Sequence, residues 1–298
     1  MIIVVTGASG FIGRRLLKNF ISAGYEIRVL SRHAGTNLPP GVKLFAWDPM
    51  QGPPPEESLR EAGVVVHLAG EPVAQRWSDS VKELIRDSRV VGTRNLVAGL
   101  KAMKRPPDAL ISSSAVGYYG SRGDEVLKES SGSSDTWLSK VCVGWEREAE
   151  AASGLGVRVV PIRTGLVLDP RGGALHQMLP PFRMGVAGKL GSGTQWMSWI
   201  HLADLASLFQ FAVETPVRGP LNGVAPYPVT NADFTQELAK VLHRPALISV
   251  PVTALKLLYG EMAEVLLSSQ RAIPTAAEAA GFRFRFPQLG PALANLLG

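Results

Sequence analysis

The stretch Ile2-Ile3-Val4-Val5-Thr6-Gly7-Ala8-Ser9-Gly10-Phe11-Ile12-Gly13 decides the fold. Its first residues, Ile2–Thr6, are apolar or β-branched without alternation, which is typical of a central parallel strand that is buried on both faces. Glycines then recur at every third position. From Phe11 to Ala23 apolar residues return every three or four positions, as they do on one face of a helix. A strand, a glycine turn and a helix in direct succession predict a βαβ unit in a parallel sheet.

The glycine turn predicts a site for a dinucleotide. Gly7 permits a tight turn, Gly10 lets the backbone approach a pyrophosphate, and Gly13 lets the helix pack closely on the sheet. The helix N-terminus adds free N–H groups and the positive end of the helix dipole, both of which attract phosphates. A turn that only joins strand to helix is the alternative. The residues expected to line the cofactor here are Gly7, Ser9, Gly10, Phe11, Ile12 and Gly13.

The end of the second strand distinguishes NAD from NADP. An acidic residue about 20 positions past the glycines would bind the ribose 2′-hydroxyl of NAD. This chain has Ser31 and Arg32 there. The Arg32 guanidinium suits bidentate hydrogen bonds to a 2′-phosphate, so the sequence favours NADP over NAD; an exposed loop arginine is the alternative. Asp48 is a candidate for binding the adenine amino group or for capping a turn before Pro49.

Strands and helices alternate along the rest of the first half of the chain. The predicted strands are 27–30, 43–46, 64–68, 109–113 and 157–162, and the predicted helices are 80–103 and 137–152. Right-handed crossovers then give an α/β, doubly wound parallel sheet, a Rossmann fold, in the order 3-2-1-4-5-6. The small residues that end the fourth strand would let a cofactor lie against the backbone. These are Leu68, Ala69 and Gly70.

Glycine- and proline-rich segments begin after Leu168. They predict an NAD(P)-binding domain at 1–168 and a smaller C-terminal substrate-binding lobe at 169–298. A helix near 202–214 is expected to return to the first domain, so the two parts are interwoven. Residues 281–287 alternate Phe and Arg like a half-buried strand whose aromatic side chains belong to the core.

Composition narrows the classes of function. Hydrophobic residues make up 46% of the 298 residues and charged residues 19%, as in a globular protein, and no apolar run approaches the roughly 18 residues of a membrane span. We therefore expect a soluble protein that does not bind membranes. The single cysteine, Cys142, fits a reducing cytoplasm. The net charge of +6 is spread along the chain, which argues against nucleic-acid binding. The five histidines lack metal-ligand spacing, so no metal is expected.

Several motifs together resemble the extended short-chain dehydrogenase/reductase superfamily, which includes nucleotide-sugar epimerases, dehydratases and reductases. The resemblance covers nearly the whole chain. The motifs are the Thr-Gly-x-x-Gly-x-x-Gly turn, His67–Gly70, Gly92–Leu96, Ser112–Ala115, Arg163-Thr164-Gly165 and Trp199–Leu205. Four further segments resemble a subgroup of epimerase-family proteins called cell-division-inhibitor-like: Gly172–Ala174, Leu179–Phe182, Leu221–Pro226 and Gly281–Leu289.

The resemblance implies an NADP-binding nucleotide-sugar epimerase or oxidoreductase with a small-molecule substrate. It adds Thr164 and Gly165 to the cofactor residues, and by analogy it implies a homodimer.

The catalytic pattern of the superfamily is incomplete. A Tyr-x-x-x-Lys pair on a helix and a Ser after the fifth strand handle the proton, because a phenol needs a nearby cation to work near neutral pH. Ser114 fits the Ser position and Lys140 the Lys position, but Thr136 stands four residues before Lys140. An alcohol titrates too high to replace the phenol. Tyr118 or Tyr119 could supply a phenol from another direction, and our catalytic candidates are Ser114, Tyr118 and Lys140.

The missing phenol leaves open whether the protein is an enzyme. Tyr118 could simply pack at the strand mouth, and Lys140 could be an exposed helix lysine. The second hypothesis is therefore a protein that binds NADP without catalysis and reports redox state to a partner.

Overall fold

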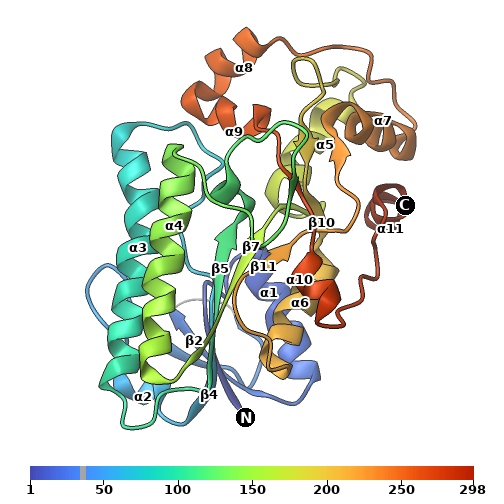
Figure 1. The fold of residues 1–298 in the computed structure, drawn as a ribbon. Helices are drawn as coiled ribbons and strands as arrows, with labels where there is room; N and C mark the ends of the chain where they lie inside the picture. The colour runs from blue at the N-terminus through green and yellow to red at the C-terminus, as the bar shows by residue number, and fades with distance from the viewer. Residues whose placement is uncertain (34–37) are drawn as a thin grey trace.

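Seven parallel strands form the central sheet of the computed structural model, which describes residues 1–33 and 38–298 (Figure 1). Their order across the sheet is β11-β7-β5-β4-β1-β2-β3, which confirms the predicted Rossmann order and adds a seventh strand at the edge. The bounds are β1 Ile2–Thr6, β2 Glu26–Ser31, β3 Lys43–Ala46, β4 Ala62–His67, β5 Ala109–Ala115, β7 Arg158–Thr164 and β11 Leu221–Gly223.

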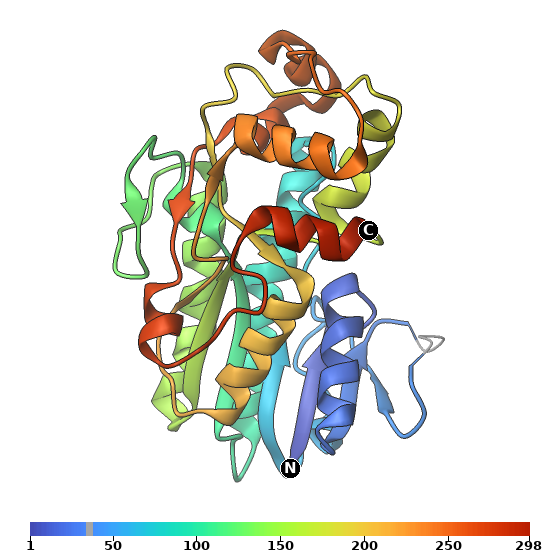
Figure 2. The same cartoon turned by 90° about the vertical axis from the view of Figure 1, so that its right-hand side faces the viewer.

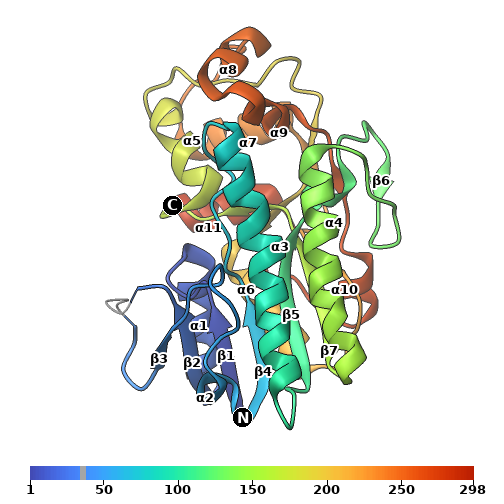
Figure 3. The ribbon, with the colours of Figure 1, turned by 90° about the vertical axis from the view of Figure 1, so that its left-hand side faces the viewer.

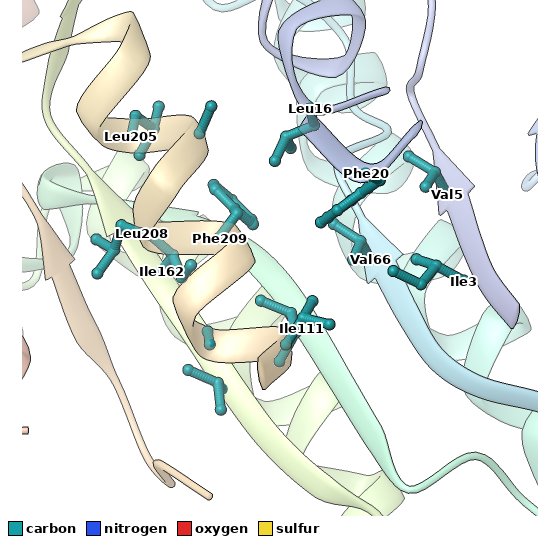
Figure 4. Close-up of a cluster of buried hydrophobic side chains, with 14 of the residues drawn as sticks. Ile3, Val5, Leu16, Phe20, Val66, Ile111, Ile162, Leu205, Leu208 and Phe209 are labelled. Carbon is teal, nitrogen blue, oxygen red and sulfur yellow. The ribbon is translucent and has the colours of Figure 1, made fainter. Parts of the chain in front are cut away.

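Helices cover both faces of this sheet, because successive strand residues point to opposite sides. Ile3 and Val5 of β1 belong to a core with α1 (Phe11–Ser22) and α6 (Leu202–Glu214). Figure 4 shows this core, with side chains of both helices facing the strands. Val4 points the other way, into a core under α3 (Asp79–Ala102) and α4 (Trp137–Glu150). Figure 3 shows α3 and α4 side by side on that face. The helix α2 (Glu56–Leu59) is short.

The C-terminal lobe lies beyond the carboxyl ends of the strands (Figure 2). It has a core of its own, built around Trp199, Phe182 and Phe234. Its helices are α5 Gly173–Arg183, α7 Asn231–Leu242, α8 Val252–Tyr259, α9 Ala263–Leu267 and α11 Leu289–Leu297, with the 3-10 turn η3 Gly260–Met262. The short helix α10 Thr275–Ala279 packs instead against β11, in the core of the central sheet. Three two-stranded sheets join β8 Leu166–Leu168 to β10 Trp199–His201, β9 Trp196–Met197 to β12 Val229–Thr230, and β6 Val126–Leu127 to β13 Arg271–Ala272.

The chain crosses between the two parts more than once. It leaves the sheet after β7, returns with α6, which packs against α1, and adds β11 beside β7. Two 3-10 turns, η1 Val116–Tyr119 and η2 Ala151–Leu155, follow β5 and α4. The division into domains at residue 168 stays a prediction. No helix formed by residues 1–33 and 38–298 is both long and apolar enough to cross a membrane.

Candidate functional site

The glycine turn after β1 forms a close-fitting cradle of backbone. Gly7 has a φ of +68°, and a Cβ on it would lie 2.7 Å from the carbonyl carbon of Leu68. A Cβ on Gly13 would lie 2.4 Å from the carbonyl oxygen of Gly7. Neither glycine can therefore carry a side chain without moving backbone. The turn lies directly against the chain that leaves β4, as a pyrophosphate-binding turn requires.

The N-terminus of α1 is free to bind an anion. Gly10 is the N-cap residue, so no side chain caps the helix, and its first turn contains no acidic residue. The first N–H groups of the helix and the positive end of its dipole are therefore left without a capping side chain. The predicted residues Ser9, Phe11 and Ile12 lie in this turn and the first turn of α1.

The predicted residues after β4 are joined to the glycine turn through Thr6. The Thr6 Oγ1 atom accepts hydrogen bonds from the N–H groups of Leu68 and Ala69, both at 3.1 Å. Gly70 comes next, beside the guanidinium of Arg89: a Cβ on Gly70 would lie 3.3 Å from its Cζ. The carboxyl ends of β1 and β4 therefore form one continuous backbone surface.

The remaining cofactor candidates lie at the ends of other strands. Ser31 ends β2 and Arg32 follows it with an exposed side chain. No carboxylate stands at either position, so the end of β2 fits a 2′-phosphate. The Asp48 Oδ1 atom accepts from the N–H of Met50 at 3.0 Å, which is the turn-capping role. Thr164 ends β7, and Gly165 lies so close to Ser198 that a Cβ would be 2.3 Å from its carbonyl oxygen.

His67 connects the same strands from within the protein. It is fully buried, its Nδ1 lies 2.7 Å from Thr6 Oγ1, and its Nε2 lies 3.0 Å from Thr93 Oγ1. Because Thr6 Oγ1 already accepts two N–H groups, its hydroxyl donates to Nδ1, and the ring proton is left on Nε2. Burial lowers the pKa of His67 to about 4, so the ring is neutral at pH 7.

This histidine should make the fold sensitive to acid. The unfolded chain takes up a proton near pH 6.5 and folded His67 only near pH 4. The contribution of neutral His67 to the free energy of unfolding is therefore complete above pH 6.5 and declines as the pH falls. At pH 5 the free energy of unfolding is lower by about 2 kcal/mol. Urea unfolding at pH 7 and pH 5 measures the change, with His67→Asn as a variant that cannot titrate. An equal loss in wild type and His67→Asn would assign it to other groups.

The Ser114 side chain is buried and hydrogen-bonded within the protein. It is 3% exposed, and its hydroxyl donates to Glu146 Oε1 at 2.5 Å. Glu146 in turn accepts two hydrogen bonds from Arg163, Nε to Oε1 at 2.9 Å and Nη2 to Oε2 at 2.8 Å. The side chains of Arg163 and Glu146 are 4% and 13% exposed. A partly buried, bidentate ion pair therefore fixes the Ser114 hydroxyl.

Both tyrosines after β5 belong to the same network. The Arg163 Cζ atom lies 3.5 Å from the centroid of the Tyr118 ring, a cation–π contact. Arg163 Nη1 donates to the Tyr119 hydroxyl at 3.0 Å, and that hydroxyl donates to Asn222 Oδ1 of β11 at 2.7 Å. Tyr119 is fully buried, whereas Tyr118 is partly exposed. Tyr118 is thus the phenol better placed to reach a ligand.

The helix that should carry the proton shuttle presents a different row of residues to β5. Thr136 is the N-cap of α4, and its Oγ1 accepts from the N–H of Ser139 at 3.3 Å. Lys140 is exposed. The row facing the end of β5 is Leu138, Cys142 and Glu146, spaced by four residues on one helical face. Burial raises the pKa of Cys142 to about 12, so its thiol is unreactive.

Arg89 of α3 brings a positive charge to the site that the sequence did not predict. Arg89 is partly buried, its Nη1 donates to the carbonyl of Ile85 at 3.0 Å, and its Cζ lies 5.1 Å from the Trp145 ring centroid. Burial lowers the pKa of this guanidinium. It lies beside Gly70, between the chain that follows β4 and the Trp145 side chain of α4. The sequence pattern of α3 does not show that Arg89 points toward Gly70. The nearby Gly92-Thr93, which belongs to one of the superfamily motifs, indicates only that this helix contributes to the site.

Comparisons with known proteins agree with this geometry. Residues 3–225 match the model of the NAD dependent epimerase/dehydratase family, and residues 250–296 match a domain of unknown function (DUF1731). The epimerase family protein Mb2239 of Mycobacterium bovis is 39% identical, over 98% of this chain and 96% of that protein. The crystal structure of human epimerase family protein SDR39U1 with NADPH has a TM-score of 0.88 and 34% identity, covering 100% and 99% of the two chains.

A nucleoside-diphosphate sugar epimerase from Corynebacterium glutamicum has a TM-score of 0.80 and 39% identity, over 100% of this chain and 58% of that one. The chain belongs to the NAD dependent epimerase/dehydratase family. This membership confirms the resemblance to extended short-chain dehydrogenases/reductases. Within residues 1–33 and 38–298, no group of three or more His, Cys, Asp or Glu side chains is placed to hold a metal ion.

Proposed function

We propose that the protein binds NADP(H) across the carboxyl ends of the strands and uses it to oxidise or reduce a small polar substrate. The observation that carries this proposal is the backbone cradle at Gly7 and Gly13, where no side chain fits and an uncapped helix N-terminus follows. Phosphates bind such a turn through N–H groups and the helix dipole. The human relative's structure contains NADPH, which supports NADP over NAD.

Arg32 is the residue expected to select NADP. Charge-assisted hydrogen bonds contribute about 1.5–3 kcal/mol, so Arg32→Ala should weaken NADPH binding by roughly 10-fold or more. NADH has no 2′-phosphate, and its affinity should stay nearly unchanged. Fluorescence titration with both nucleotides measures the two effects in one variant. Equal losses of affinity for NADPH and NADH would show that Arg32 does not bind the 2′-phosphate.

Ser114 and Tyr118 are the proposed contacts of the reacting oxygen. The cofactor accepts or donates the hydride. Because the Ser114 hydrogen is donated to Glu146, its lone pairs are what a substrate hydroxyl can reach. Ser114 could accept the hydroxyl proton while its own proton passes to Glu146, a relay that needs no tyrosine on α4. Lys140 would have to turn inward to bind the nicotinamide ribose, whereas Arg89 already lies beside Gly70.

The substrate class we propose is a nucleotide-linked sugar or a similar polar carbonyl compound. The name of the Corynebacterium glutamicum relative supports it. A homodimer and a cytoplasmic location remain predictions; light scattering and fractionation would test them.

A second candidate function has an observation in its favour. Thr136 caps α4 and Lys140 is exposed, so α4 does not present the Tyr–Lys pair that transfers the proton in the superfamily. A protein that binds NADP without turning over a substrate, and whose occupancy a partner senses, fits that arrangement.

Turnover separates the two candidates. Purified protein with NADP(H) is tested on a panel of nucleotide sugars and carbonyl compounds for epimerisation and for change in nicotinamide absorbance. Turnover that falls at least 100-fold in Ser114→Ala, with NADPH affinity unchanged, supports the enzyme; Tyr118→Phe tests the other contact and Lys140→Met the exposed lysine. Tight NADPH binding without turnover of any compound supports the second candidate.

A further inference from the structure

A polar cavity lies where α1, the loop after β8, the N-terminus of α6 and α11 meet. Figure 2 shows α11 next to the ends of α1 and α6. The cavity has a volume of about 350 Å³, and none of the glycine-turn residues 7–13 lines it. Its polar lining consists of Arg15, Asp169, Arg171, His201, Arg285 and Asn295.

The lining carries excess positive charge. Arg171 donates to both oxygens of Asp169, at 3.0 and 2.8 Å, so these two charges offset each other. Across the part of the chain that the structure describes, neither Arg15 nor Arg285 forms an ion pair. The lining therefore keeps a net positive charge, although the Asp204 carboxylate in the first turn of α6 interacts electrostatically with Arg285. A positively charged lining attracts anions.

His201 adds a hydrogen-bond donor of fixed direction. Its Nδ1 accepts from the N–H of Ala203 at 3.0 Å, which leaves the ring proton on Nε2. Burial lowers the pKa of His201 to about 4, and Arg15 and Arg285 act in the same direction, so the ring is neutral at pH 7. The residue is 5% exposed and stacks on Phe286 with 4.1 Å between ring centroids.

The donors of this cavity lack acceptors. His201 Nε2 is buried and forms no hydrogen bond of good geometry, although the Asn295 side chain lies close enough to the ring to raise its pKa. Arg15 Nε is likewise buried and without a partner. Leaving a buried donor unsatisfied costs about 1–3 kcal/mol. Both atoms are closed to water, so a ligand with several acceptor oxygens would remove this cost after a small movement of the two side chains.

We propose that this cavity binds a small phosphate-bearing molecule. A phosphate monoester has three acceptor oxygens and a charge near −2, which is complementary to the net positive charge of the lining. The volume falls in the range of small-molecule sites.

The cavity and the glycine turn share a wall. A Cβ on Gly172 would lie 2.9 Å from the Cβ of Phe11, so the loop that carries Asp169 and Arg171 packs against the first residue of α1. The cavity nevertheless has its own donors and does not depend on the proposed function.

Calorimetric titration with inorganic phosphate tests the site. Protein saturated with NADPH, which blocks the glycine turn, is titrated at constant ionic strength and compared with a chloride titration. Wild type should bind one phosphate per chain. Arg15→Gln and His201→Asn should each weaken binding by about 10-fold or more. The Asn side chain can still cap α6 but lacks the Nε2–H donor, and unfolding curves verify that both variants fold.

Two further variants show whether phosphate binds in this cavity, at the exposed neighbouring arginine or at the glycine turn. Arg14→Gln removes the same charge from the exposed neighbouring residue and should bind phosphate like wild type. Gly10→Glu, titrated without NADPH, should also retain the site, and this arm stands even if the protein proves not to bind NADPH. Absence of saturable phosphate binding, equal weakening in Arg14→Gln, or loss in Gly10→Glu with retention in Arg15→Gln would each overturn the proposal.

Discussion

Gly10→Glu is expected to weaken NADPH binding by at least about 100-fold while the protein keeps its fold. Gly10 has φ −68° and ψ 165°, a conformation open to any residue, and a Cβ there would meet only the Gly7 carbonyl oxygen at 3.4 Å. A carboxylate at this N-cap position would occupy the N–H groups and the dipole that the pyrophosphate needs. Juxtaposed like charges cost several kcal/mol, and every 1.4 kcal/mol is tenfold in affinity.

Gly10→Ala is the matched control, because it adds the Cβ without the charge. It should fold and bind NADPH within a few fold of wild type, whereas Gly13→Ala should impair folding because its Cβ would collide with Gly7 and Ala8. Fluorescence titration gives the affinities, and circular dichroism with thermal unfolding gives the fold. Unchanged NADPH affinity in Gly10→Glu would remove the glycine turn from the cofactor site.

The strand order was predictable because each βαβ unit is encoded locally, in a β-branched run, a helical repeat and a short connection. The seventh strand, β11, was not predicted. Its three residues, Leu221, Asn222 and Gly223, have no strand pattern of their own and pair with β7. The Asn222 N–H is bound by Glu129, 93 residues away in sequence. Interactions of this kind are invisible to local periodicity.

The alternation of Phe and Arg at 281–287 predicted a strand, and the structure contains none at these residues. The side chains behave as expected, since Phe282 and Phe284 pack in the main core. The backbone differs: the N–H groups of Arg285 and Phe286 donate to the carboxylate of Asp204. A period of two thus fixes which side chains are buried, but not whether a neighbouring strand satisfies the backbone.

The Tyr-x-x-x-Lys spacing of the superfamily pointed to Lys140 as a site residue, with Thr136 in the place of the Tyr. The structure begins α4 at Trp137, as predicted, so Thr136 caps the helix and Lys140 is exposed. The apolar stripe of Val141, Cys142 and Trp145 sets which face of α4 is buried and could have predicted this orientation. The partnership of Ser114 with Glu146 needed the tertiary structure, because 32 residues separate them.

Replacing Glu146 with alanine should destabilise the fold by about 3–5 kcal/mol. Arg163 is 4% exposed, and removing its carboxylate leaves a guanidinium that is out of water and without a counter-ion. Glu148→Ala is the matched control on the same helix: it breaks the pair with Arg94, which is 54% exposed, and should cost about 1 kcal/mol or less. Urea unfolding of both variants gives the comparison.

The double variant Glu146→Leu with Arg163→Met distinguishes the free-energy cost of an unpaired buried charge from the net stability that the ion pair contributes. Apolar residues of similar size can replace a buried ion pair with little loss, so the double variant should recover most of the stability lost in Glu146→Ala. It should not recover turnover, because Ser114 would no longer donate to a carboxylate. Equal destabilisation by Glu146→Ala and Glu148→Ala would mean that Arg163 is solvated well enough to stand alone, and the fixed orientation of Ser114 would then lose its physical basis.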